Sequence, residues 1–513
     1  MGKAARRSLT ILLLLVFMAP CASPAGAQAI GYVPLDDRPY SLDRVVEAAE
    51  ALGVKLLLPP DSFFRGQDGV SDFEGLYEWL ASCPKEGAVI VAADAFLFGG
   101  LVSSRTNDLD EGEITRRFEA LKGLVSLSSG QRFALFGTLL RLPRVSQGVL
   151  DADYNAKWAP QLFRLAGLQS AASRGILSAD ELAVAERLLK TIPPPVLREW
   201  ANRRNRSLRF ANRLLALHSS RGIGFVGIGL DDNVSPILLE QEFRSMAGTI
   251  GEIPRGQAAV VPGVDQMGLL LFGRAILEGK PQQRVASLFS LPSVKGGHPN
   301  YSGFSPKESL EIQAEVLGVR LVESRDEADM VLVGNLPRDG RSWEASSPMN
   351  RPVPDEADRA LCRTIEEILD SGKRVAVADI AFDNGADRGF MAALRERKLL
   401  DRLAAYSSGN TSDNAIGIAL ASGVMSKWMS DGQRKWILFA RLLDEWGYQA
   451  EVRPAVVSKG PFGGQASSTA LEADIRERLH AFSSIALSDF GPVEYEVSYP
   501  WGRLFEIRIT RKE

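Results

Sequence analysis

Short runs of consecutive apolar residues alternate with amphipathic segments along most of this chain, and this alternation constrains its fold more than any other feature. The first apolar runs are Ile30–Val33, Val54–Leu58 and Ala88–Ala93. Helical patterns separate them, at Leu42–Leu52 and Phe73–Ser82. Runs that are apolar throughout are typical of strands covered by helices on both faces. The alternation therefore predicts an α/β fold with two consecutive, mainly parallel-sheet units.

Two interruptions of the alternation predict the domain organisation. From about residue 150 to 220 the pattern is wholly helical, which we interpret as a helical insertion. A segment rich in Gly, Pro and Ser, Pro292–Pro306, separates two α/β halves. We expect a first α/β domain over residues 28–280, for which closure into a (β/α) barrel stays open. A second α/β domain is expected over residues 281–425, and a tail of helices and strands over residues 426–513.

The first residues have the pattern of a secretory signal peptide. Lys3, Arg6 and Arg7 precede a short apolar run, and Ala25-Gly26-Ala27 supplies a cleavage site. The apolar run is too short to span a bilayer, and the alternative of a lipid attached to Cys21 fits the flanking residues less well. We therefore expect residues 1–27 to be removed. The mature protein should be secreted or periplasmic, with no membrane association.

Composition narrows the classes of function. The formal net charge of −3 becomes −6 once the three basic residues of the signal peptide are removed, which predicts no nucleic-acid partner. After cleavage only Cys83 and Cys362 remain, and the three histidines form no H-x-x-H pattern. We therefore expect no zinc site, no cofactor and no assigned metal ligand. The G-x-S-x-G motif of serine hydrolases is also absent.

Polar side chains follow the predicted strands at their carboxyl ends. Asp36-Asp37-Arg38 follows the first strand, and Asp231-Asp232-Asn233 follows the strand Gly224–Leu230. Ligands of parallel α/β sheets bind outside the carboxyl ends of the strands, so we expect one shared polar cleft that includes Asp37, Asp94 and Asp231 or Asp232. The other predicted substrate-binding residues are Arg105, Asp265, Asn335, Asp383, Asn410 and Thr411. Solvated loop polarity is the alternative at each single position.

Asp231 and Asp232 are the predicted catalytic residues. Two like charges so close raise the pKa of one carboxyl, so that one acid is protonated while the other is ionised. A general acid beside an anionic stabiliser requires this division, and glycoside hydrolysis is the commonest chemistry built on carboxylates alone. The alternative is that Asp231 caps the following segment and Asp232 is solvated.

Two further segments have open interpretations. The arginine-rich stretch Arg203–Arg213 has helical spacing, and it predicts either a solvated basic face or a wall for an acidic glycan. The polar segment Pro337–Pro354 is long for a connection, which favours a lid or a ligand-binding loop.

Three functions are consistent with these observations. The first is a secreted carboxylate-dependent hydrolase, in particular a glycoside hydrolase-like enzyme acting on glycans or another small polar substrate. The second is a non-catalytic, two-lobed glycan- or solute-binding protein. The third is a Mg- or Ca-dependent hydrolase, because clustered aspartates bind hard cations.

Several short motifs of the chain, taken together, match a pattern seen elsewhere. They are Leu35-Asp36-Asp37-Arg38-Pro39, the segment from Asp94 to Arg105, Gly229-Leu230-Asp231-Asp232-Asn233, Pro262-Gly263-Val264-Asp265, Gly409-Asn410-Thr411 and Tyr499-Pro500-Trp501-Gly502-Arg503. These motifs resemble a bacterial family catalogued as domain of unknown function 4127, over almost the whole mature chain. In that family an acidic residue often follows the aspartate of Pro-Gly-x-Asp, whereas this chain has Gln266. The resemblance implies no established activity.

Overall fold

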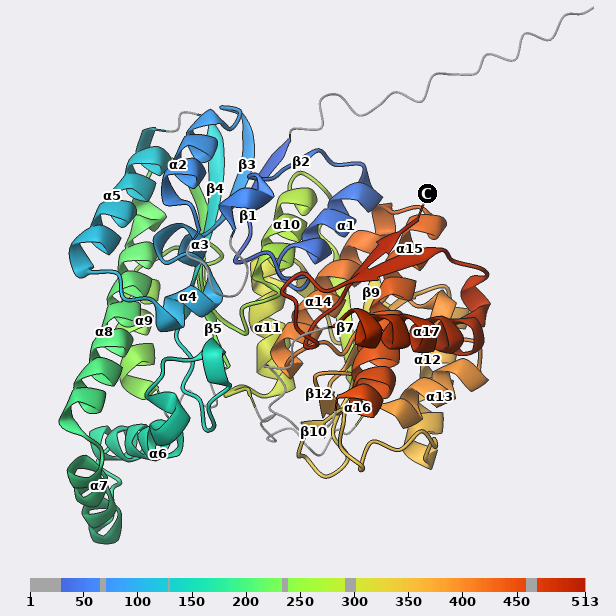
Figure 1. Cartoon of the computed structure of the whole chain (residues 1–513). Coiled ribbons are helices and arrows are strands. Elements are labelled where there is room, and N and C mark those ends of the chain that lie inside the picture. Colours follow the sequence, from blue (N-terminus) through green and yellow to red (C-terminus); the bar gives the residue numbers. More distant parts are fainter. Residues whose placement is uncertain are drawn as a thin grey trace, which may run out of the picture.

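The computed structural model describes residues 29–64, 71–127, 130–232, 239–290, 301–457 and 468–512. The predicted signal peptide and Asn233 lie outside these residues. Two mainly parallel sheets lie side by side, with helices between and around them (Figure 1). Within the described residues, none of the helices combines the length and apolar character that a membrane crossing requires.

The first unit, from β1 to α10, is built on an open sheet of six parallel strands in the order β2-β1-β3-β4-β5-β6. The strands are β1 (Ile30–Val33), β2 (Leu56–Leu57), β3 (Gly87–Ala92), β4 (Gln131–Leu139), β5 (Ile223–Leu230) and β6 (Ala258–Pro262). Among the described residues β2 and β6 are edge strands that do not pair, so the sheet does not close into a barrel. The chain adds β2 on one side of β1 and then β3 to β6 on the other side. In parallel sheets ligands bind at such a switch point, which here lies at the carboxyl ends of β1 and β3.

Helices cover both faces of this sheet and form the predicted insertion. They are α1 (Asp43–Leu52), α2 (Phe73–Ser82), α3 (Ala93–Leu97), α4 (Leu101–Thr106), α5 (Glu111–Leu127), α6 (Asn155–Ser173), α7 (Ala179–Thr191), α8 (Pro194–Ala216), α9 (Glu240–Gly251) and α10 (Met267–Leu277). The insertion comprises α6, α7 and α8. Its longest helix, α8, packs on β4 and β5, whereas α7 has no buried residue and extends away from the sheet (Figure 1).

The second unit, from β7 to α14, repeats the strand order of the first. Its five parallel strands lie in the order β13-β11-β9-β7-β8, which is the same 2-1-3-4-5 sequence as in β1 to β5. They are β7 (Arg284–Phe289), β8 (Arg320–Leu321), β9 (Met330–Asn335), β11 (Arg374–Asp379) and β13 (Ala405–Ser407). A separate two-stranded ribbon joins β10 (Trp343–Glu344) to β12 (Phe382–Asp383). The helices of this unit are α11 (Pro306–Leu317), α12 (Glu356–Asp370), α13 (Arg388–Glu396) and α14 (Ser412–Met425).

The C-terminal segment continues with helices and ends in an antiparallel hairpin. Its elements are α15 (Asp431–Leu442), the π-helix η6 (Leu443–Val452), α16 (Arg453–Val456), α17 (Thr469–Ala486), β14 (Tyr495–Ser498) and β15 (Arg508–Arg511). The hairpin returns to the first unit, because Arg508 forms an ion pair with Asp43 at 2.7 Å. Arg508 also donates to the carbonyl oxygen of Asp37 at 3.2 Å, so β15 is held beside the carboxyl end of β1.

One continuous hydrophobic core joins the two units. Helix α14 contacts α10 and α11 as well as β11 and β13, and nearly all of its residues are buried. Two glycines allow this close packing: a Cβ atom at Gly417 would lie 2.0 Å from Gln313 Oε1, and one at Gly423 would lie 2.6 Å from the Cβ of Ala376. Apolar residues of both sheets belong to the same buried cluster. The shared core fixes the two units relative to each other.

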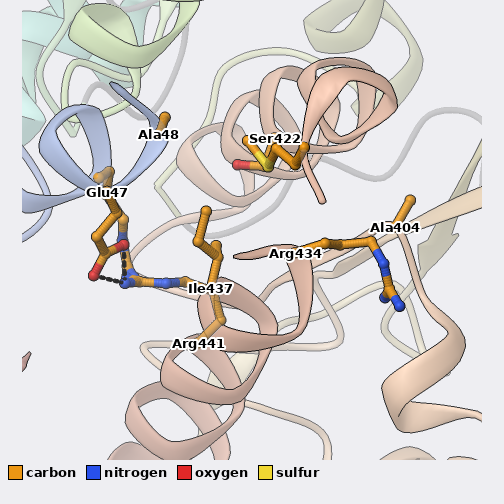
Figure 2. Close-up of a pocket in the computed structure, with 9 residues that line it drawn as sticks. Glu47, Ala48, Ala404, Ser422, Arg434, Ile437 and Arg441 are labelled. Atoms are coloured by element: carbon orange, nitrogen blue, oxygen red, sulfur yellow. Dashed lines mark hydrogen bonds and ion pairs between the residues drawn. The ribbon is translucent and has the colours of Figure 1, made fainter. Parts of the chain in front are cut away.

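A buried ion cluster forms a second connection, between α1 and the helices that follow α14. Figure 2 shows the contact between Arg441 and Glu47, in which Arg441 donates at 2.6 Å. Arg44 donates to Asp444 at 3.2 Å and to Glu445 at 3.0 Å. The cavity beside this cluster has a volume of about 20 Å³. That is room for a single water molecule, so the cavity belongs to the interface and is too small for a substrate.

Candidate functional site

A cavity of about 470 Å³ lies at the carboxyl end of the first sheet, facing the second unit. Among the predicted site residues, its lining brings together Arg38, Arg105, Asp231, Asp232, Asp265, Asn410 and Thr411. The other polar and aromatic lining residues include Arg141, Arg144, Tyr301, Glu344, Asn384, Trp501, Arg503 and Phe505. Its volume falls in the range of small-molecule sites. These residues follow different strands, and the structure brings them together at the carboxyl end of the first sheet.

Asp231 follows β5 directly and is held in a bidentate ion pair. Arg105 donates from Nε to Oδ2 at 2.8 Å and from Nη2 to Oδ1 at 2.6 Å. The residue is only 1 % exposed. Burial favours a higher pKa for this carboxyl, but the guanidinium groups of Arg105, Arg141 and Arg38 outweigh it and hold the pKa below its ordinary value. Asp231 is therefore a fixed negative charge in the wall of the cavity.

Asp232 is next in the chain but has a different environment. Its side chain is 29 % exposed, and its contact with Arg141 is a single, longer one of 3.2 Å. Loss of hydration raises the pKa of the Asp232 carboxyl and the charge of Asp231 raises it further, against the opposing charges of Arg141 and Arg105. The structure thus separates two adjacent carboxyls into an ionised group and one that holds its proton more readily.

Asp265, after β6, connects the first unit to the second. Arg38 donates to Asp265 Oδ1 at 2.7 Å and to Asp36 Oδ2 at 2.8 Å, so this arginine lies between two carboxylates. The second oxygen of Asp265 accepts from the side chain of Asn410, which follows β13. Two strand ends that are far apart in the sequence are therefore joined at the base of the cavity.

The opposite wall contributes a carboxylate that sequence reasoning did not assign. Glu344, in β10, accepts from the Tyr301 hydroxyl at 3.0 Å and from Asn384 Nδ2 at 2.9 Å. Burial raises the pKa of the Tyr301 hydroxyl, and the negative charges of Glu344 and Asp232 raise it further. Glu344 belongs to the segment Pro337–Pro354, whose length and polarity predicted a lid or ligand loop. The length and polarity of the segment indicated that it could contact a ligand, but only the structure shows that Glu344 is the residue that lines the cavity.

The C-terminal segment supplies two aromatic residues of the lining. Trp501 and Phe505 are half-buried in the cavity wall, and Trp501 donates from its indole nitrogen to Asp37 at 2.7 Å. Arg503 lies 4.6 Å from the Trp501 ring centroid and forms a bidentate ion pair with Glu506. The motif Tyr499–Arg503 contributed to the family resemblance, but no sequence pattern indicated that it returns to the site.

Backbone conformation also marks the cavity. Among the described non-glycine residues with positive φ, three line it: Asp232 at 39°, Asn384 at 58° and Asn410 at 66°. Asp and Asn tolerate this region better than most residues, and such conformations concentrate at functional sites. Each of the three residues turns the chain at the cavity wall.

Helix α8 supports both arginines that contact the acid pair. Arg203 donates to the carbonyl oxygens of Arg105, at 3.3 Å, and of Asn107, at 2.7 Å. Arg204 donates to the carbonyl oxygens of Leu140 and Arg141 at 3.3 and 3.4 Å. The arginine-rich stretch is therefore neither a free basic face nor a glycan wall at these positions. Its role is to hold the backbone behind the site.

Several predicted site residues lie outside the cavity lining. Asp36 is buried against Arg38, and Asp37 faces Trp501. Asn335 lies in the interior of the second unit and donates to Asp379 at 2.9 Å, and Asp383 accepts from Ser342 at 2.8 Å. These side chains shape the surroundings of the site without facing it.

Asp94 departs furthest from the expectation of one shared cleft. It accepts from the amide and the hydroxyl of Thr138, both at 2.7 Å, and is 3 % exposed. Helix α3 begins at Ala93, so Asp94 turns toward β4 instead of the cavity. Burial raises its pKa to about 7. The expectation that Asp94 lines the cleft is corrected, because this residue lies in the protein interior.

The described residues contain no group of three or more His, Cys, Asp or Glu side chains arranged to hold a metal ion. Among the cavity carboxylates, Asp231 and Asp265 form ion pairs with Arg105 and Arg38. A hard cation would have to displace these guanidinium groups.

Comparison with known proteins identifies one match. The family model described as Protein of unknown function (DUF4127) matches residues 30–510. No curated protein matches the chain, and no solved structure matches it. The match covers both units and the C-terminal segment, so every residue of the cavity lining lies within it.

Proposed function

The chain belongs to the family DUF4127, whose function is unknown, and on that premise we propose that it is a carboxylate-dependent hydrolase, specifically a glycoside hydrolase-like enzyme acting on glycans. The observation that carries the proposal is the contrast between Asp231 and Asp232. The Asp231 carboxylate is held in an ion pair by Arg105, whereas the Asp232 carboxyl is partly exposed to the cavity and has a raised pKa. A general acid needs this combination of access and proton affinity.

Three groups have distinct roles in the proposed reaction. Asp232 donates its proton to the glycosidic oxygen as the bond from that oxygen to the anomeric carbon breaks. Asp231 stays ionised and stabilises the positive charge that develops on the sugar ring. Glu344, on the opposite wall, is the second carboxylate that such hydrolysis requires, as a base for water or as a nucleophile. Tyr301 and Asn384 hold its two oxygens in place.

The aromatic wall favours a sugar as the substrate. Trp501 and Phe505 present apolar surface, while carboxylates and amides around them supply hydrogen-bond acceptors and donors. A sugar ring has apolar C–H faces and polar hydroxyl groups at its edges, so it can contact both kinds of lining residue. Small-molecule pockets generally combine an apolar lining with a few polar groups at fixed positions.

The alternative of a two-lobed binding protein receives less support. Binding proteins of that type close around a ligand by hinge motion between lobes. Here α10, α11 and α14 form one core with both sheets. A preformed cavity between units that share a core is better suited to catalysis with fixed groups.

A substrate screen tests the proposal. The protein without residues 1–27 is incubated with neutral, N-acetylated and acidic glycans, with and without chelator. Asp232→Asn should retain the fold and lose about a hundredfold or more in turnover, because an amide has a similar shape but cannot donate the proton. Asp326→Asn, at an exposed position, is the matched control. Full activity of Asp232→Asn would remove it from the mechanism, and loss of wild-type activity with chelator would favour a metal-dependent hydrolase.

We further propose that the protein acts outside the cytoplasm, because a basic start, an apolar run and a small-residue cleavage site occur in the required order. N-terminal sequencing of the exported protein should find a start near Gln28. A start at a lipidated Cys21 would contradict this cleavage.

A further inference from the structure

Five arginines line the cavity, and four of them are neutralised by carboxylates. Arg38 pairs with Asp36 and Asp265, Arg105 with Asp231, Arg141 with Asp151 and Asp232, and Arg503 with Glu506. The positive charges of these four arginines are therefore balanced by carboxylates of the protein itself. Arg144 is the fifth.

Arg144 differs from the other four in its contacts. It lies on the loop after β4, three positions beyond Arg141, and it is exposed. Its guanidinium lies 4.8 Å from the ring centroid of Phe163 in α6. Within the described part of the chain, no carboxylate pairs with it. Stacking on an aromatic ring restrains the guanidinium plane and leaves its N–H edge available for a planar, bidentate partner.

The ion pairs of the lining leave Arg144 as the arginine that can take an anion. The other four arginines are matched by six carboxylates, namely Asp36, Asp151, Asp231, Asp232, Asp265 and Glu506. Among the five arginines of the lining, Arg144 is the one that stacks on a ring and has no carboxylate partner within the described residues.

We propose that Arg144 binds an anionic group of the substrate, and that the substrate is an acidic sugar with a carboxylate, such as a uronic acid residue. A carboxylate is planar and matches the guanidinium fork, with two parallel hydrogen bonds. The ring of the sugar then lies toward Trp501 and Phe505, and its scissile bond toward Asp232. This inference rests on the proposed glycan-cleaving function for the identity of the ligand, but its first test does not need turnover.

Chemical modification tests the anion site directly. Phenylglyoxal reacts with accessible arginines, and mass spectrometry of peptides reports the rate at each position. Sodium glucuronate should slow the modification of Arg144 severalfold, while D-glucose and sodium chloride at equal ionic strength should not. Arg255, whose side chain is 91 % exposed, is the internal control and should be unaffected. Equal modification of Arg144 with glucuronate and with glucose would overturn the proposal, and protection by sodium sulfate alone would replace the carboxylate with a sulfate ester.

A kinetic comparison separates this inference from the proposed function. Aryl glucuronides and the matching aryl glucosides, in both anomers, are offered to the wild type, Arg144→Gln, Arg144→Lys and Arg255→Gln. For glucuronides, Arg144→Gln should raise KM about tenfold or more, the effect of losing one charged hydrogen-bonded contact. Arg144→Lys should lose less, because it keeps the charge without the planar fork.

The outcomes of the two experiments are distinguishable. Protection of Arg144 by glucuronate without hydrolysis of any glycoside would support the anion site and contradict the proposed enzyme. Hydrolysis of glucosides in preference to glucuronides, without protection, would support the enzyme and overturn the anion site. Protection together with a KM effect confined to glucuronides is the result that we expect.

Discussion

Replacing Asp94 with Asn should remove a pH-dependent cost to stability. Asp94 is buried, and its pKa is raised from 3.8 to about 7. In the folded protein the group therefore holds its proton more tightly than in the unfolded chain. Its contribution to stability is fully present below about pH 3.8 and is lost as the pH rises through about 7. Asn cannot ionise, so the variant escapes this loss.

The magnitude follows from the size of the shift. One pKa unit corresponds to about 1.36 kcal/mol, so a change from 3.8 to about 7 corresponds to roughly 4 kcal/mol between acid and alkaline pH. We treat this value as an upper bound, because water can enter a folded interior when a charge forms. The amide keeps both hydrogen bonds: its oxygen accepts from the amide of Thr138, and its nitrogen donates to the Thr138 hydroxyl.

Thermal unfolding at pH 5 and pH 8.5 measures the effect. The advantage of Asp94→Asn over the wild type should be larger at pH 8.5 than at pH 5, because only part of the loss between pH 3.8 and about 7 has occurred at pH 5. The exposed control Asp326→Asn should change neither midpoint. A variant that is less stable than the wild type at pH 8.5 would refute the reasoning, because it would show that the ionised carboxylate of Asp94 is favourable in the fold.

Three further predictions concern the walls of the cavity. Arg105→Gln should lower the free energy of unfolding by about 3–5 kcal/mol, because it leaves the buried Asp231 unpaired, and the double variant Arg105→Gln with Asp231→Asn should recover much of this in denaturant titrations. Trp501→Ala should raise KM about tenfold with a smaller effect on kcat, as measured by steady-state kinetics, since it removes an aromatic contact to substrate. Glu344→Gln should lower kcat about a hundredfold or more while the thermal midpoint stays near that of the wild type, and an unchanged kcat would exclude Glu344 from the reaction.

The sequence predicted the fold through its local patterns. The apolar runs became parallel strands, and the helix predicted at Phe73–Ser82 has the same bounds in the structure. The second sheet was harder to predict in one place. Strand β7 has no continuous apolar run, because Arg284–Phe289 contains Arg and Ser among its apolar residues, although it lies between β8 and β9. Among the described residues the first sheet is open, so it is not a barrel. The sequence left this alternative open because a strand pattern alone does not show whether the first and last strands pair.

The site residues that follow the carboxyl end of a strand directly were predictable from the sequence. Asp231 and Asp265 follow β5 and β6, and the rule for parallel sheets places both at one edge. The same rule failed for Asp94, because a helix begins immediately after β3 and turns the side chain inward. Glu344 and Trp501 come from a loop segment and from the C-terminal tail. Their positions depend on tertiary packing, which no local pattern in a single sequence records.

The pH dependence of kcat/KM in the wild type and in Asp231→Asn tests the central claim most directly. The claim is that Asp232 donates a proton while burial and the ionised Asp231 keep the pKa of Asp232 raised. Activity should fall as the pH rises through the pKa of Asp232, and this alkaline limb should move to lower pH in Asp231→Asn, because the neighbouring negative charge is removed and Arg105 is left unpaired. An alkaline limb that stays in place or moves to higher pH would contradict the account, as would the absence of hydrolysis with every glycan tested.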